Sequence, residues 1–140
     1  MATYTKYENF VQVLCNKEVD LFGTEDTVRA VIHTDAPVVA TDTTVANLTQ
    51  ISGTGYSAAD IQNDATRTGG TVTMTGVDYT WTATAADWTS TARYVSIYDD
   101  TPTTPTADPL IASWDYGSTF AVGNGESFTL DFGASVATIA

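Results

Sequence analysis

Residues 91–98 read Thr-Ala-Arg-Tyr-Val-Ser-Ile-Tyr, and residues 110–116 read Leu-Ile-Ala-Ser-Trp-Asp-Tyr. The first stretch carries apolar side chains on both of its faces, which is typical of a strand in the centre of a sheet. The second stretch alternates with the period of two that strand geometry imposes on side chains. Both stretches therefore predict strands, and the rest of the fold is worked out from them.

Further strands are predicted on either side of this pair. Residues 27–33 place alternate apolar side chains on one face, and residues 128–132 alternate phenylalanine and leucine with polar residues. Between residues 72 and 81 the apolar positions change phase at Gly76, which predicts a turn or a bulge there. Residues 135–139 predict a short final strand. Turn residues recur between these segments, as they do in sandwiches and barrels.

Composition supports the same class, because the chain contains 27 threonines, a β-branched residue that favours strands. We predict a mainly β protein, an antiparallel β-sandwich of jelly-roll or immunoglobulin-like type with a short N-terminal α-helix. Apolar residues at spacings of three and four predict that helix over residues 4–15, and a second short helix is expected over 42–51. We expect residues 1–140 to form one domain, with a helical segment at 1–22 and the sandwich body at 27–140.

Charge excludes several classes of partner. Asp and Glu total 17 against 5 Lys and Arg, for a net charge of -12, so the phosphate contacts that bind nucleic acid are not expected. No stretch approaches the roughly 20 apolar residues of a membrane-spanning helix, and residues 1–8 lack the order of a signal peptide. We therefore expect no nucleic acid, no membrane and no cofactor as partners, and synthesis in the cytoplasm.

The residues that could carry chemistry have plainer interpretations. His33, the only histidine, would need a serine and an acid beside it to form a hydrolase triad, and no Gly-x-Ser-x-Gly motif is present. The single cysteine, Cys15, is expected to be a buried, inert thiol.

Acidic residues suggest two further sites. Asp99, Asp100 and Asp108 flank a proline-rich loop at 99–109 and are weak calcium candidates, with solvated turn residues as the favoured interpretation. Asp99 with Asp115 is a possible glycosidase pair, which would require two carboxyl groups about 5–10 Å apart.

Other residues are candidates for contact with a protein partner. Trp81 and Trp114 alternate in phase with core residues, whereas Trp88 falls in a connection and is expected to make outside contacts. The remaining interface candidates are the apolar residues of the expected helix and the prolines of the 99–109 loop: Tyr4, Tyr7, Phe10, Pro102 and Pro105.

Residues 91–117 contain a strand ending in Tyr-Asp-Asp, a Thr/Pro-rich loop and a strand opening with Pro-Leu-Ile. In this the chain resembles a group of small virion structural proteins of tailed bacteriophages. Upstream features follow in the same order: a Tyr-x-x-Phe helix, a Val-x-Ala-Val-Ile strand, a Gly-Thr-Gly-Tyr turn and an Asp-x-x-Trp strand. Some members of the group resemble head decoration or cement proteins that sit as trimers on the capsid.

The resemblance implies a role and no catalytic residue. It implies a non-enzymatic homotrimer on the capsid surface of the virion, with the major capsid protein as partner. Residues 1–22 are then expected to face the capsid or a sister subunit. Two alternatives stay open: a tail fibre or receptor-binding module that binds host-surface glycan, and a carbohydrate-active enzyme with two close carboxylates.

Overall fold

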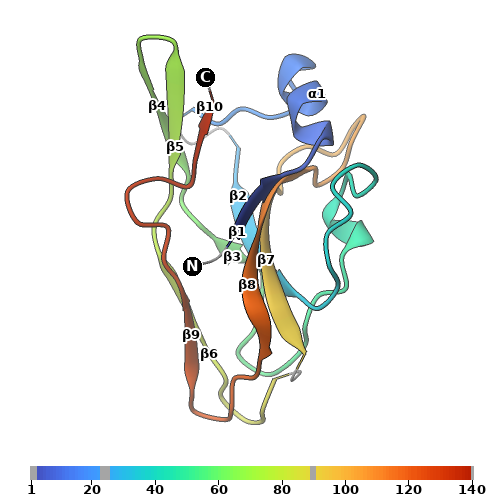
Figure 1. The fold of residues 1–140 in the computed structure, drawn as a ribbon, viewed down its shortest axis with the longest axis vertical. Helices are drawn as coiled ribbons and strands as arrows, with labels where there is room; N and C mark the ends of the chain where they lie inside the picture. The colour runs from blue at the N-terminus through green and yellow to red at the C-terminus, as the bar shows by residue number, and fades with distance from the viewer. Residues whose placement is uncertain (1–2, 23–25, 89–90, 140) are drawn as a thin grey trace.

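The computed structural model describes residues 3–22, 26–88 and 91–139 and consists of two layers of antiparallel strands (Figure 1). The larger layer is a five-stranded sheet containing, in spatial order, β1 (Thr3–Lys6), β8 (Leu110–Phe120), β7 (Ala92–Asp99), β2 (Val28–His33) and β3 (Ala59–Asp60). Each neighbouring pair in this sheet is antiparallel. The two stretches quoted at the outset are therefore central strands that pair with each other, and the mainly β, sandwich-like fold predicted from the sequence is confirmed.

The second layer is a long ribbon broken in the middle. One part is a three-stranded sheet of β10 (Ala137–Ile139), β5 (Thr71–Thr75) and β4 (Asp64–Thr68), and the other pairs β6 (Tyr79–Thr82) with β9 (Ser127–Leu130). The chain passes from β5 to β6 through Gly76, where the sequence predicted a break, and this prediction is confirmed. A side chain on Gly76 would press on Val136 and Ile61, so the ribbon bends where only a hydrogen fits easily.

The central strands are buried on both faces because each face of the sheet is covered. One face meets the ribbon in the main core, where Ile97 packs in the same cluster as Met74 and Trp81. The other face is covered by the connection between β2 and β3, and a smaller apolar cluster there includes Val31, Tyr98, Leu110 and Leu48. This arrangement accounts for the unbroken apolar sequence of β7.

The predicted helices are shorter than expected. Residues 3–6 are strand β1, which pairs with β8, and only α1 (Asn9–Cys15) is helical, so the helix predicted over 4–15 is wrong in its first half. The backbone hydrogen bonds that β8 offers to this segment outweigh its helical spacing. Over 42–51, only a 3₁₀ turn, η1 (Val45–Asn47), forms. Strands β3 and β4 were not predicted. No helix in the described part of the chain is long and apolar enough to cross a membrane.

Candidate functional site

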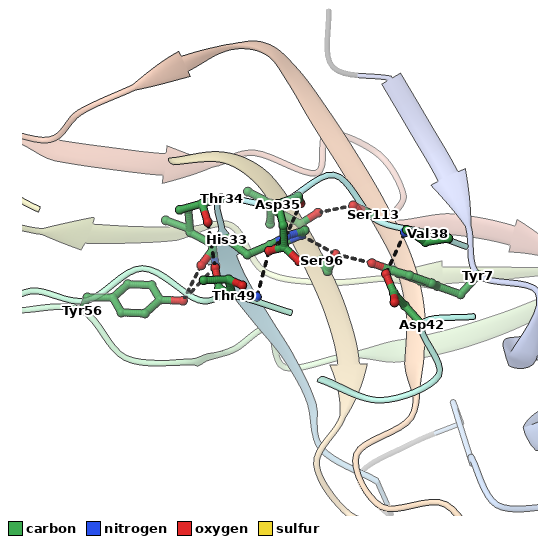
Figure 2. A network of polar contacts seen from close by, with 12 residues as sticks. Tyr7, His33, Thr34, Asp35, Val38, Asp42, Thr49, Tyr56, Ser96 and Ser113 are labelled. Carbon is green, nitrogen blue, oxygen red and sulfur yellow. Dashed lines mark hydrogen bonds and ion pairs between the residues drawn. The ribbon is translucent and has the colours of Figure 1, made fainter. Parts of the chain in front are cut away.

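A buried polar chain links the N-terminal segment to the centre of the sheet (Figure 2). Tyr7 OH lies 3.0 Å from Ser96 Oγ, which lies 2.8 Å from His33 Nε2. On the far side of the imidazole, Nδ1 lies 3.0 Å from the carbonyl oxygen of Asp35. A carbonyl oxygen can only accept, so Nδ1 carries the proton; Ser96 then donates to Nε2, and Tyr7 donates to Ser96.

This chain has the connectivity of a nucleophile, a base and an orienting group, yet it is closed to solvent. The side chains of Tyr7, His33 and Ser96 are all fully buried. Burial lowers the pKa of His33, which keeps the imidazole neutral although the Asp35 carboxylate is nearby. In this conformation no substrate reaches Ser96 Oγ, and the network joins Tyr7, the residue after β1, to β2 and β7 instead.

The acids at the 99–109 loop do not gather into one site. Asp99 is fully buried, whereas Asp100 is exposed and its Oδ2 lies 2.6 Å from Arg29 Nε. Asp108 is half-buried, and burial raises the pKa of its carboxyl. Among the residues that the structure describes, no group of three or more His, Cys, Asp or Glu side chains is placed to hold a metal.

Asp99 has an unusual environment. Its Oδ1 accepts a hydrogen bond from the Thr101 amide, while Oδ2 has no donor within the described residues. Burial, with the neighbouring Asp26 carboxyl, raises the pKa of Asp99 to about 7. The candidate glycosidase pair of Asp99 and Asp115 does not form, because the strand register places Asp115 opposite Tyr94, at the far end of β7.

The predicted contact residues fall into two groups. Tyr4 is 45% exposed on β1, and Pro102 and Pro105 lie on the exposed loop, so these three remain available to a partner. Tyr7 and Phe10, in contrast, belong to the interior of the isolated chain.

Two further expectations, for Trp88 and for Cys15, are wrong. Trp88 is only 3% exposed: its ring packs against Tyr56, and its indole N–H donates to the Thr54 carbonyl oxygen, so it is a core residue rather than a surface contact. Cys15, expected to be buried, is exposed.

The open side of the sandwich carries a groove that the sequence did not predict. It lies between the edge strands β1 and β10 and beside α1, with a volume of about 200 Å³. We call it the acid-free groove, because no Asp or Glu is among its lining residues. These residues are Tyr4, Lys6, Phe10, Val11, Leu14, Leu21, Met74, Ile111, Ala137, Thr138 and Ile139. A signal for it was present in the sequence, since residues 9–16 and 132–140 carry no charge in a chain of net charge -12.

A second groove of about 240 Å³ lies where β8 faces β9 and the chain that leads to β10. We call it the aromatic groove. It is lined by Val95, Trp114, Tyr116, Phe128, Thr129, Leu130, Asp131, Phe132, Ser135 and Val136. Tyr116 and Phe128 of this lining both contact the ring of Phe120, and Tyr116 is 56% exposed.

Comparison with known proteins identifies no relative. No protein-family model matches the chain, and no curated protein or solved structure matches it.

Proposed function

We propose that this chain is a non-enzymatic structural protein of a bacteriophage virion, a cement or decoration protein. In this role it binds the outside of the head as a homotrimer and stabilises the shell by bridging subunits of the major capsid protein. The observation that supports the proposal is the acid-free groove, an apolar surface on a strongly acidic chain through which the copies of an oligomer can associate. The sequence of residues 91–117, which resembles small virion proteins, gives this surface its biological setting.

The physical properties of the chain suit this role. Protein interfaces are depleted of charged residues at their centres, and the acid-free groove, whose lining has Lys6 as its one charged residue, has that character. The net charge of -12 of the whole chain, with every carboxylate outside the lining of the groove, keeps a densely covered particle soluble and discourages binding to free nucleic acid. Local threefold positions of an icosahedral shell would match a trimer.

Two observations support a role without catalysis. Ser96 has a base within hydrogen-bonding distance but is sealed beneath the covering connection. Asp99 has the raised pKa of a general acid, yet its side chain is fully buried as well. Neither group meets solvent, where a polysaccharide would have to bind.

The aromatic groove favours one second candidate, a tail or receptor-binding module for host-surface glycan. Its exposed Tyr116 ring lies near Asp131 and Thr129, a mixture of aromatic and polar groups that suits small ligands. In that case the binding residues differ from those expected from the sequence, Trp88 and the 99–109 loop.

Co-sedimentation with capsids that lack the protein tests the proposal. We expect the purified chain to pellet with such capsids at a saturating ratio, and not with capsids that already carry a full complement of it. Failure to pellet with either would contradict the cement role. Glycan binding that is lost in Tyr116→Ala would then support the receptor-binding module.

A further inference from the structure

The acid-free groove is open to solvent and lies between two unpaired strand edges. Tyr4 on β1 is 45% exposed and Val11 on α1 is 48% exposed, and both line the groove. Within the described residues, β1 pairs only with β8, and β10 pairs only with β5. Backbone donors and acceptors therefore face outward from both edges, beside a surface that is apolar between them.

The strands at the opposite edges of the two larger sheets, β3 and β4, are less suited to pairing. Strand β3 is only two residues long, and β4 carries Asp64 and Arg67 along its length. Charged side chains and short strands are the usual means of preventing contact between sheet edges. Strand β10 is short but has no charged residue, and α1 has none either.

Electrostatics determines which partner fits. Two copies of a chain with net charge -12 repel each other over most approaches, because 17 carboxylates meet 17 others. The residues that line the groove include no carboxylate, and their only charged group is Lys6. Two copies that meet at this face can bury apolar area without placing carboxylates against each other.

We infer that the acid-free groove is the contact surface between copies of this chain, which associate through α1, β1 and β10. The inference rests on the proposed function in one respect, because it assigns the oligomer of the cement protein to this face. The groove's occupant is a second copy, and the capsid binds elsewhere on the oligomer.

Matched substitutions test the assignment. Val11→Glu places a carboxylate in the groove on a helix that tolerates glutamate, and Val77→Glu places the same charge at a valine that is 53% exposed outside it. Light scattering and sedimentation equilibrium should give the wild type a multiple of 14.8 kDa. Val11→Glu should raise the dissociation constant roughly tenfold or more, because burying an unpaired carboxylate is unfavourable. Val77→Glu should keep the wild-type mass.

A second pair of substitutions distinguishes weakened association from misfolding. Tyr4→Glu lies in the groove and Tyr116→Glu lies on β8 outside it, with both tyrosines largely exposed. Only Tyr4→Glu should weaken association, with circular dichroism unchanged in both. A wild type that stays at 14.8 kDa up to its solubility limit overturns the inference. The inference is also overturned if the groove variants and the control variants weaken association equally, or if none of them weakens it.

The two proposals fail in different ways. A monomeric wild type that still pellets with undecorated capsids contradicts the self-association surface and leaves the cement role standing. An oligomer that Val11→Glu dissociates, but that ignores capsids, supports the surface and contradicts the cement role.

Discussion

Asp99 is the residue whose ionisation opposes folding most directly. Its pKa is about 7 in the folded chain against 3.8 for an ordinary aspartate, so the folded state holds the proton more tightly than the unfolded state. The contribution of Asp99 to the free energy of unfolding is therefore at its full value below about pH 4 and is lost as the pH rises through 7.

Asp99→Asn removes that dependence, because an amide keeps the acceptor for Thr101 and adds a donor facing Asp26. We expect the variant to be more stable than the wild type by about 2 kcal/mol at pH 8, with a smaller difference at pH 4. Urea unfolding at both pH values measures this. A variant that is less stable than the wild type at pH 8 would show that the carboxylate makes a favourable contact.

Ser96 connects two buried groups, the Tyr7 hydroxyl and His33 Nε2. Ser96→Ala leaves Tyr7 OH and His33 Nε2 without their hydrogen bonds, and we expect a loss of about 2–3 kcal/mol in unfolding free energy. Ser113→Ala is the comparison, since Ser113 is as buried as Ser96 and also lies near the Tyr7 hydroxyl, but it donates a longer bond of 3.3 Å to the Val95 carbonyl oxygen and is not hydrogen-bonded to His33 in the described residues. Equal losses in the two variants would contradict the special role of Ser96.

His33 adds a pH dependence of opposite sign to that of Asp99. Its pKa is lowered by burial, so the unfolded chain binds the proton more readily, and stability falls as the pH drops below about 6.5. His33→Gln should be less stable than the wild type at neutral pH and should lose less stability between pH 7 and pH 5. Thermal unfolding at the two pH values gives the comparison, and parallel losses in both proteins would assign the acid dependence to other groups.

At the level of elements, the turn at residues 53–56 is fixed against the β6 ribbon. Gly55 has φ +90°, and a Cβ there would lie 2.1 Å from the Thr82 carbonyl oxygen. Tyr56 follows and exchanges hydrogen bonds with the backbone of Ile32 on β2. The turn thus joins the two layers.

Gly55→Ala should therefore cost about 3 kcal/mol or more, since backbone strain is added to a clash with a carbonyl. Gly125→Ala separates the two effects, because Gly125 has φ +85° with open space around it. There we expect only the strain, about 1–2 kcal/mol. Chemical denaturation distinguishes them, and similar losses at both sites would mean that the close approach to Thr82 relaxes freely.

The elements that were predicted correctly from the sequence are those whose pattern is local. Strand β2 alternates cleanly, and β7 is apolar throughout, so both follow from their own residues. Strand β1 does not: Tyr4 and Tyr7 have helical spacing, and only pairing with distant β8 makes the segment extended. Trp88 was likewise expected to be exposed, because Gly53 and Tyr56, against which its ring packs, lie far from it in the sequence.

At the scale of the whole molecule, charge should govern association. Salt shortens the Debye length from about 14 Å to about 4 Å between roughly 0.05 M and 0.5 M. If copies meet at the acid-free groove, added salt removes repulsion between the outer carboxylates without weakening the contact. We expect the dissociation constant to fall threefold or so over this range. Sedimentation equilibrium at both salt concentrations measures it, and dissociation by salt would indicate an interface of ion pairs instead.

The placement of the lysines has a practical consequence. The sequence has only two, Lys6 on β1 and Lys17 just beyond α1, and both are exposed. Acylating reagents directed at side-chain amines therefore modify only this border of the fold. A chain coupled to a surface through its lysines would be held in a narrow range of orientations, with the acid-free groove turned toward the support and the rest of the molecule presented to solution.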